Sequence, residues 1–184
     1  MDGADTRLDA ATLFQRHAEF VARFLSRLGV APGDLDDVVQ EVFLVAHARG
    51  GYVPGPAKPT SYLGAIAARA ASSYRRRRGS QLQRHAVLSE DLHGAQPDPV
   101  QILQSNESAR ALSHALAALD PELSSVLLLV DQEGASCLEV AASSGTPVGT
   151  VYWRLHKARK ALRSALEAHE RGRVTPVRLR KEVR

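Results

Sequence analysis

The side chains best suited to binding chemistry lie between positions 151 and 163, where cations alternate with apolar residues. One predicted helix face carries Val151, Leu155, Ala158 and Leu162 at buried-stripe spacing. The opposite side presents Trp153, His156, Lys157 and Lys160, with Arg154, Arg159 and Arg163 on its flanks. Arginine and lysine can bind guanine edges and phosphates in a DNA major groove, and the groove would cover the tryptophan. An amphipathic helix that docks on another protein is the alternative.

A second basic face is predicted between residues 60 and 78. Its buried stripe consists of Leu63, Ile66, Ala67, Ala70 and Tyr74. The other side presents Ala65, Arg69, Ser72 and Arg76, with Tyr62 at its edge. An aromatic ring that stacks on a base, beside arginines that bind phosphate, suits single-stranded DNA. Alternatively, Tyr62 belongs partly to the core and the arginines from 75 to 78 only close the C-terminus of the helix.

An acidic face is predicted for the helix from residue 34 to about residue 47. The apolar side consists of Leu35, Val38, Val39, Val42 and Ala46. The other side carries Asp36, Asp37, Gln40 and Glu41, with Leu44 in its centre. A leucine among exposed carboxylates indicates a surface that binds a protein partner. An ordinary solvated face with one apolar residue remains the alternative.

Catalytic and metal-binding motifs are missing from the sequence. There is no glycine-rich phosphate loop, no G-x-S-x-G and no Cys-x-x-Cys, and Cys137 is the only cysteine. Adjacent Asp36 and Asp37 lie about 100° apart on a helix, so they do not converge as an acid–base pair. We therefore predict no catalytic residue, no metal, no cofactor and no enzymatic activity. Tyr74 beside the arginine run is the only candidate nucleophile of a recombinase.

The elements that position these residues are predicted to be helices throughout. Gly and Pro separate the periodic stretches, Asp34 and Thr60 are candidate N-caps, and Asp120–Pro121 begins a further helix. Ser136 with Glu139 forms a capping box, and Thr146–Pro147 begins the last helix after a turn at Gly145. We predict an all-α fold of two helical domains: residues 1–78 with three helices, a flexible linker at 79–104, a helix-turn-helix domain at 105–169 and a basic tail at 170–184.

Composition and charge agree with this organisation. Aromatic residues make up only 5% of the 184 residues, which favours helices over sheets. Residues 150–184 carry a net charge of +8, against −5 for residues 101–149, so the C-terminal end suits a phosphate backbone. No apolar run reaches the roughly 18 residues of a membrane span, and residues 1–11 do not resemble a signal peptide. We expect no membrane insertion and a cytoplasmic location.

The order of motifs resembles the sigma-70 family of RNA polymerase sigma factors. DLDDVVQEVFL at 34–44 resembles region 2.2, and residues 62–78 resemble regions 2.3 and 2.4. EGASCLEVAA at 133–142 and PVGTVYWRLHKARK at 147–160 resemble region 4. The resemblance covers about residues 10–78 and 112–166 and omits regions 1 and 3, which is typical of the extracytoplasmic-function (ECF) group.

This resemblance implies partners and site residues. The region 2-like domain would bind the β′ clamp helices of core RNA polymerase and open the minus-ten element of promoter DNA. The region 4-like domain would bind the β flap and the minus-thirty-five element, and a separate anti-sigma factor would hold the protein inactive. The implied polymerase-binding residues are Asp36, Asp37, Gln40, Glu41 and Leu44. The implied DNA-binding residues are Tyr62, Arg69, Ser72, Arg76, Thr150, Tyr152, Trp153, Arg154, Lys157 and Arg159.

The sequence departs from the family pattern at a few of these positions. Tyr62 stands where region 2.3 usually has tryptophan, and Arg69 and Ser73 stand where the third helix commonly has Asn and Asp. Tyr152–Trp153 replaces a basic–small pair. The promoter sequence is therefore not predicted. Two other functions remain: a stand-alone helix-turn-helix regulator, which leaves the acidic face around Leu44 unexplained, and the recombinase that would use Tyr74.

Overall fold

A computed structural model of the chain describes residues 7–86 and 107–173. These residues form α-helices joined by short turns, and the only β-type pairing among them is an isolated bridge between Leu8 and Tyr52. The helices are α1 (Ala10–Arg27), α2 (Leu35–Ala48), α3 (Pro59–Ala86), α4 (Glu107–Ala118), α5 (Pro121–Leu127), α6 (Cys137–Ser144) and α7 (Val148–Arg173). The all-helical fold class predicted from the sequence is confirmed. None of these helices is long and apolar enough to cross a bilayer.

The first half of the molecule packs α1 and α2 against one side of α3. Leu13, Leu25, Val42 and Leu63 from these helices are all fully buried. Asp9 begins α1 as its N-cap, because its carboxylate accepts a hydrogen bond from the Thr12 N–H over 2.8 Å. These contacts fix α2 and α3 side by side.

One predicted helix end in this half is wrong, and one predicted cap lacks its side-chain bond. Asp34 is the N-cap residue of α2 as predicted, but its side chain makes no capping hydrogen bond. It ends a short 3₁₀ turn, η1 (Pro32–Asp34), and its carboxylate accepts from the Tyr74 hydroxyl at 2.7 Å. Helix α3 does not end at Arg78 but continues to Ala86, because Gly79 is tolerated inside an established helix. Residues 79–86 of the predicted linker are therefore helical, and residues 87–104 lie outside the described part of the chain.

The second half follows the predicted caps closely. Asp120 caps α5 through the Glu122 N–H, and Ser136 and Glu139 form the capping box of α6. Between α5 and α6 the chain makes a π-helical turn, η2 (Leu128–Gln132), which the sequence did not predict. Helix α7 extends past the predicted end at residue 169 to Arg173, and the rest of the predicted basic tail, residues 174–184, lies outside the described part.

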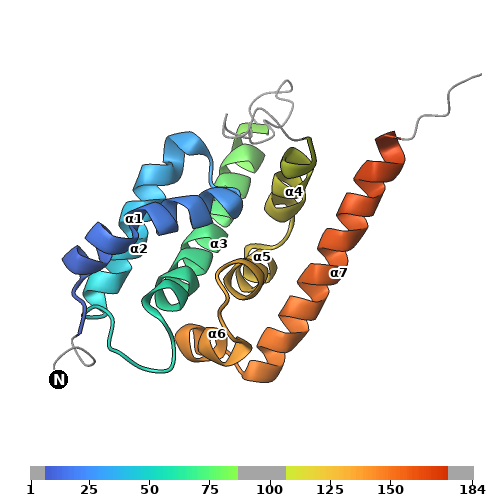
Figure 1. The fold of residues 1–184 in the computed structure, drawn as a ribbon. Helices are drawn as coiled ribbons and strands as arrows, with labels where there is room; N and C mark the ends of the chain where they lie inside the picture. Colours follow the sequence, from blue (N-terminus) through green and yellow to red (C-terminus); the bar gives the residue numbers. More distant parts are fainter. Residues whose placement is uncertain (1–6, 87–106, 174–184) are drawn as a thin grey trace, which may run out of the picture.

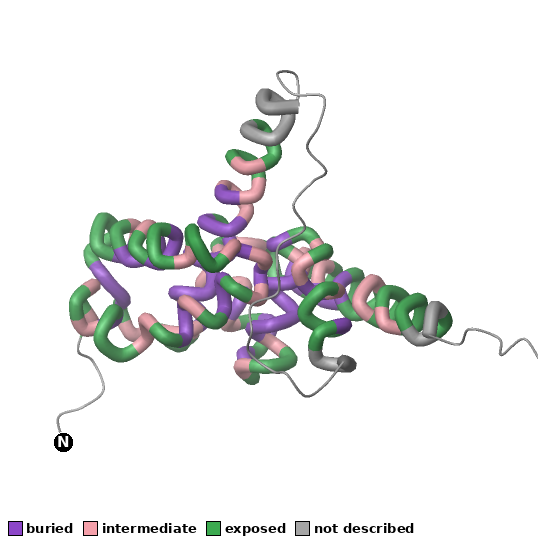
Figure 2. The backbone as a smooth tube through the Cα atoms, turned by 90° about the horizontal axis from the view of Figure 1, so that it is seen from above, coloured by how far each residue is buried: buried purple, intermediate pink, exposed green. Residues whose placement is uncertain are grey.

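The two halves are packed against each other. Figure 1 shows α3 between α1–α2 on one side and α5–α6 on the other, with α7 on the far side of α5. The buried apolar side chains form one cluster that includes residues of both halves, such as Leu63 of α3 and Leu129 of η2. Buried segments accordingly meet at the centre of the molecule, while the C-terminal parts of α3 and α7 project outward (Figure 2). Within the described ranges, the sequence-predicted domains share a core.

Candidate nucleic-acid and protein-binding surfaces

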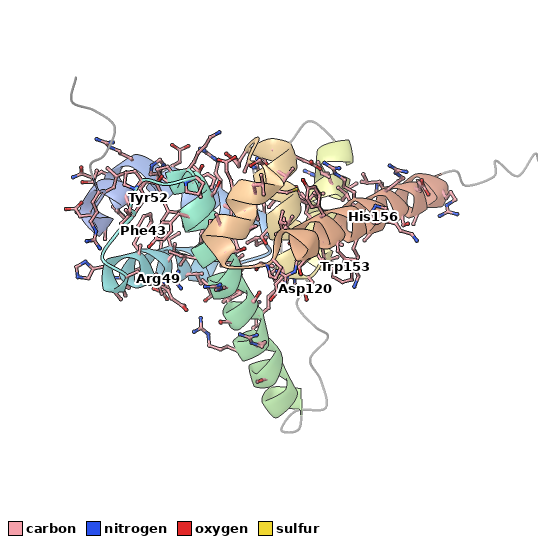
Figure 3. The ribbon with its side chains drawn as sticks, turned by 90° about the horizontal axis from the view of Figure 1, so that it is seen from below. Phe43, Arg49, Tyr52, Asp120, Trp153 and His156 are labelled. Atoms are coloured by element: carbon pink, nitrogen blue, oxygen red, sulfur yellow. The ribbon has the colours of Figure 1, made fainter. Side chains whose placement is uncertain are left out.

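The outer side of α7 presents large side chains to solvent. Tyr152 is 58% exposed and Trp153 is 57% exposed, and Figure 3 labels Trp153 and His156 on this helix. The Lys157 ammonium lies 4.8 Å from the centre of the Trp153 ring, a cation–π contact that orders both side chains. Thr150 is half-buried in the first turn of α7, and its N–H donates to the Pro147 carbonyl. A continuous aromatic and basic surface therefore begins near the N-terminus of α7.

Two of the predicted DNA-binding arginines on α7 form ion pairs within the second half. Arg154 pairs with Glu122 of α5. Arg159 donates from two nitrogens to Asp131 of η2, and this hydrogen bonding raises the pKa of the guanidinium. Both arginines therefore tie α7 to the α5–η2 segment. The sequence could not reveal this, because each partner lies about thirty residues away on another helix.

A turn at Gly145 sets the angle between α6 and α7. Gly145 ends α6 in the left-handed conformation at φ 67°, a geometry in which glycine avoids the steric strain of a Cβ. Val151, Leu155 and Ala158 of α7 are buried, as is Val140 of α6. The predicted apolar stripe of α7 thus packs inward, and its aromatic and basic side faces out. This is the arrangement of a helix-turn-helix.

The acidic side of α2 is open to solvent. Leu44 is 61% exposed, and Asp36, Asp37 and Gln40 are exposed around it. Glu41 is half-buried and accepts from Arg77 of α3 at 3.0 Å. The structure therefore brings together the five residues that the sequence grouped, on a surface with an apolar centre. Their role in binding polymerase stays a prediction.

The predicted DNA face of α3 is open only at its two arginines. The Tyr62 ring packs 5.8 Å from that of Tyr52, its hydroxyl is buried without a hydrogen-bond partner, and burial raises its pKa. Arg69 donates to the Ser144 carbonyl of α6 at 2.6 Å, and the Ser72 hydroxyl is buried without a partner. Arg69 and Arg76 both remain exposed, and Arg76 bonds only locally, to Ser73 at 3.1 Å.

The arginine run is used inside the molecule rather than only closing the helix. Arg75 donates to the Leu119 carbonyl, Arg77 pairs with Glu41, and Arg78 bonds to the Tyr74 hydroxyl. The Tyr74 hydroxyl also donates to Asp34, and its residue is only 7% exposed. A tyrosine so placed does not present a nucleophile to a DNA phosphate, so the arrangement gives the recombinase hypothesis no support. The interdomain role of Arg75 was missed, because no local sequence signal marks a contact with the other half.

Comparison with protein-family models finds two matches in this chain. The model described as sigma-70 region 2 matches residues 13–81, and the model described as sigma-70, region 4 matches residues 109–162. The first match spans the α1–α3 half with its acidic and basic faces. The second spans α4 to the middle of α7, including the helix-turn-helix.

Similar curated proteins carry related names. The chain is 34% identical over 161 residues to the ECF RNA polymerase sigma factor SigE of Mycolicibacterium smegmatis, covering 85% of this chain and 61% of that protein. It is 30% identical over 158 residues to the ECF RNA polymerase sigma-E factor of Escherichia coli K12, covering 82% of each. The chain therefore spans less than two thirds of the first relative and most of the second.

Two solved structures have a similar arrangement of helices. The sigma factor RpoE, solved in complex with the anti-sigma factor NepR from Bartonella quintana, matches with a TM-score of 0.58 and 21% identity, over 84% of this chain and 94% of that one. CnrH, solved in complex with the cytosolic domain of CnrY, matches with a TM-score of 0.52 and 26% identity, over 86% and 88%. The first likeness shows the fold alone.

Proposed function

Because this chain belongs to the ECF group of the sigma-70 family, we propose that it is a transcription initiation factor that binds core RNA polymerase and directs it to promoters. Its work is binding rather than covalent chemistry. Acting with polymerase on chromosomal DNA would place it in the cytoplasm. The observation that carries the proposal is the presence, in one chain, of an exposed acidic surface with an apolar centre on α2 and an exposed aromatic and basic surface on α7.

The acidic surface of α2 is the proposed polymerase contact. Leu44 would supply the desolvated apolar anchor, and the exposed side chains Asp37 and Gln40 around it would supply the polar rim that protein interfaces use. Glu41 is already paired with Arg77, so it would contribute to the interface as part of an ion pair. In a family member the partner surface would be the β′ clamp helices.

The outer surface of α7 is the proposed reader of duplex promoter DNA. Trp153 and Lys157 lie in the N-terminal half of the helix, the part that enters the major groove in helix-turn-helix proteins. Arg154 and Arg159 are held by Glu122 and Asp131, so they would fix the angle of α7 and contact phosphate only by exchanging partners. The basic face of α3 would bind the single strand of the opened minus-ten element.

A separate anti-sigma factor is the proposed regulator. Both structural relatives named above were solved in complex with a partner, in one case called an anti-sigma factor. A partner that covers the α2 surface or the α7 surface would prevent the binding steps proposed here. The α2 and α7 surfaces would then bind polymerase and DNA in the active protein and the anti-sigma factor in the inhibited one.

Transcription in vitro with purified core polymerase tests the proposal. We expect the full chain to direct initiation on genomic fragments, and Gln40→Ala/Leu44→Ala to weaken core binding at least about tenfold, because a buried anchor dominates an interface. Gln15→Ala/Leu138→Ala removes an exposed glutamine and an exposed leucine elsewhere and is the matched control. A chain that binds promoter duplex but neither binds nor redirects core polymerase would be a stand-alone regulator.

A further inference from the structure

The exposed side of α7 begins with large apolar side chains. Tyr152 and Trp153 lie in the second turn of the helix, and both are more than half exposed. Val148, which is 36% exposed, lies one turn before Tyr152 on the same side of the helix. Neighbouring exposed apolar groups of this size are typical of a binding surface that a partner covers. A partner that covers them well must itself offer apolar groups to the two rings.

The two arginines in the N-terminal half of α7 are already paired. Arg154 donates to Glu122 of α5, and Arg159 donates two hydrogen bonds to Asp131 of η2. A bidentate bond to O6 and N7 of guanine, the commonest specific contact in a major groove, needs two nitrogens of one guanidinium. Recognition of guanine by either arginine would therefore disturb an ion pair that holds α7 in place.

The exposed cations beside the rings suit the DNA backbone. The Lys157 ammonium lies 4.8 Å from the centre of the Trp153 ring, and Lys160 and Arg163 are exposed farther along the helix. Their charges attract phosphates, and phosphate contacts position a protein on DNA without reading the sequence. The contact with Lys157 also restrains the Trp153 ring before binding, which lowers the entropy lost on association. The two rings are therefore the side chains best placed to read bases.

Thymine is the base whose major-groove edge matches an aromatic ring. It presents a C5-methyl group there, whereas the edges of guanine, cytosine and adenine present hydrogen-bond donors and acceptors. An aromatic ring packed on such a donor or acceptor would bury it without a partner, which costs free energy. A ring packed on a methyl group instead buries apolar area on both molecules. The chemistry of the exposed start of α7 therefore favours thymine.

We propose that Tyr152 and Trp153 are specificity-determining residues that recognise the C5-methyl groups of thymine in the duplex bound by α7. The inference rests on the proposed function of α7 as the reader of duplex promoter DNA. Trp153 supplies a ring restrained by Lys157, and Tyr152 supplies a second ring at the next position of the helix. A 5-methylcytosine carries its methyl group on the same ring carbon, so it satisfies the same contact.

Exchange of thymine for deoxyuridine tests the contact, because it removes the methyl group and keeps every hydrogen-bonding group of the base. The full chain, alone and bound to core polymerase, first selects its preferred duplex from a randomised library. Deoxyuridine then replaces each thymine of that duplex in turn, and fluorescence anisotropy measures the affinities. The variants are Tyr152→Ala and Trp153→Ala. Arg163→Ala is the matched control, because it removes an exposed cation from the same helix and leaves both rings in place.

We expect deoxyuridine at one or more positions to weaken binding by the unaltered chain about fourfold, the effect of one buried methyl group. At such a position Tyr152→Ala or Trp153→Ala should bind the two duplexes equally, while Arg163→Ala should keep the difference. Cytosine at that position should bind more weakly than 5-methylcytosine. Equal affinity for the thymine and deoxyuridine duplexes at every position would overturn the proposal, as would a methyl effect that persists in both alanine variants.

Failure of the proposed function gives a different result from failure of this inference. If the chain selects no duplex sequence, either alone or with core polymerase, α7 is not a reader of DNA and both proposals are wrong. If the chain selects a sequence and its affinity does not depend on the methyl groups, only the recognition of thymine is wrong. Weaker core polymerase binding by Trp153→Ala, with no methyl effect, would show that the rings bind a protein instead.

Discussion

At the scale of single residues, the solvent-exposed side of α7 was predictable from the sequence. The ion pairs that fix this helix to the rest of the second half were not. The 3.6-residue period alone separates the buried Val151 and Leu155 from the exposed Trp153, as the structure confirms. The same period cannot show that Arg154 and Arg159 are held by carboxylates of α5 and η2, because those partners come from distant sequence. Because Arg154 and Arg159 lie on the flanks of the exposed side, the sequence suggested that both are free to contact DNA. Their ion pairs show that they are less free than this position suggests.

Trp153 should determine which promoter sequence is preferred. Its exposed ring, ordered by Lys157, can contact base edges, so Trp153→Ala should change the ranking of sites and weaken the best one by about 1–3 kcal/mol. Arg163→Ala is the control for a phosphate contact; it should lower affinity evenly and reduce the salt dependence. Selection from a randomised duplex library at two salt concentrations measures both. Unaltered ranking and salt slope in both variants would favour the protein-docking alternative for α7.

Glu139 should make the stability of the second half depend on pH. The hydrogen bond from the Ser136 N–H, at 2.8 Å, holds the pKa of this carboxyl below its ordinary value, with smaller contributions from the Ser136 hydroxyl and Lys58. The carboxylate therefore stabilises the fold above the pKa of an unfolded glutamate, and this contribution is lost as the pH falls through the folded pKa. Glu139→Gln should flatten the fall in melting temperature at acid pH, whereas Glu133→Gln, outside the capping box, should not.

At the scale of elements, caps were predictable and helix ends were less so. Asp120 and Ser136 act as predicted, because a cap is a local arrangement of a side chain and the next N–H groups. Asp34 has the right residue type but bonds instead to Tyr74, forty positions away. Helix α3 passes Gly79 because one glycine weakens a helix without ending it. The π-helical turn η2 carries no recognised sequence signal.

A side chain at Gly145 should strain the turn between α6 and α7. At φ 67° an alanine adopts a left-handed conformation that costs about 1–2 kcal/mol, although the space around Gly145 is open. Gly149→Ala is the matched control, because it lies in the first turn of α7, also in open space, and should stabilise the helix by about 0.5–1 kcal/mol. Urea unfolding measures both. Equal effects of the two substitutions would show that φ at Gly145 does not limit stability.

At the scale of the whole molecule, the two domains could be predicted and their packing could not. Each domain is specified by its own periodic stripes, but the second buried side of α3 consists of Gly64, Ala65, Ala68 and Ser72. Small residues beside arginines resemble a solvent-facing or DNA-binding surface in the sequence. Only the three-dimensional contact of Gly64 with Leu129 shows that this side is covered by the other half.

The shared core predicts that the two halves will associate even when no peptide bond joins them. Residues 1–94 and 95–184, expressed together as separate chains, should co-purify, because the same buried cluster includes both Leu63 and Leu129. A connecting segment supplies an effective concentration of order millimolar, so loss of the link should weaken the association without changing its contacts. Size-exclusion chromatography with light scattering measures the complex.

The same split chain distinguishes association through the Gly64–Leu129 contact from non-specific association. Gly64→Val in the first chain should abolish co-purification, since its side chain would occupy the position of Leu129, whereas Gly79→Val should leave the complex intact. Helical circular dichroism of each chain alone shows whether it folds without its partner. If the halves fold separately and never associate at concentrations up to the effective one, proximity alone cannot hold them together in the intact chain. The packed arrangement would then not be the main state of the intact protein, and the α3 contact would be too weak to maintain it.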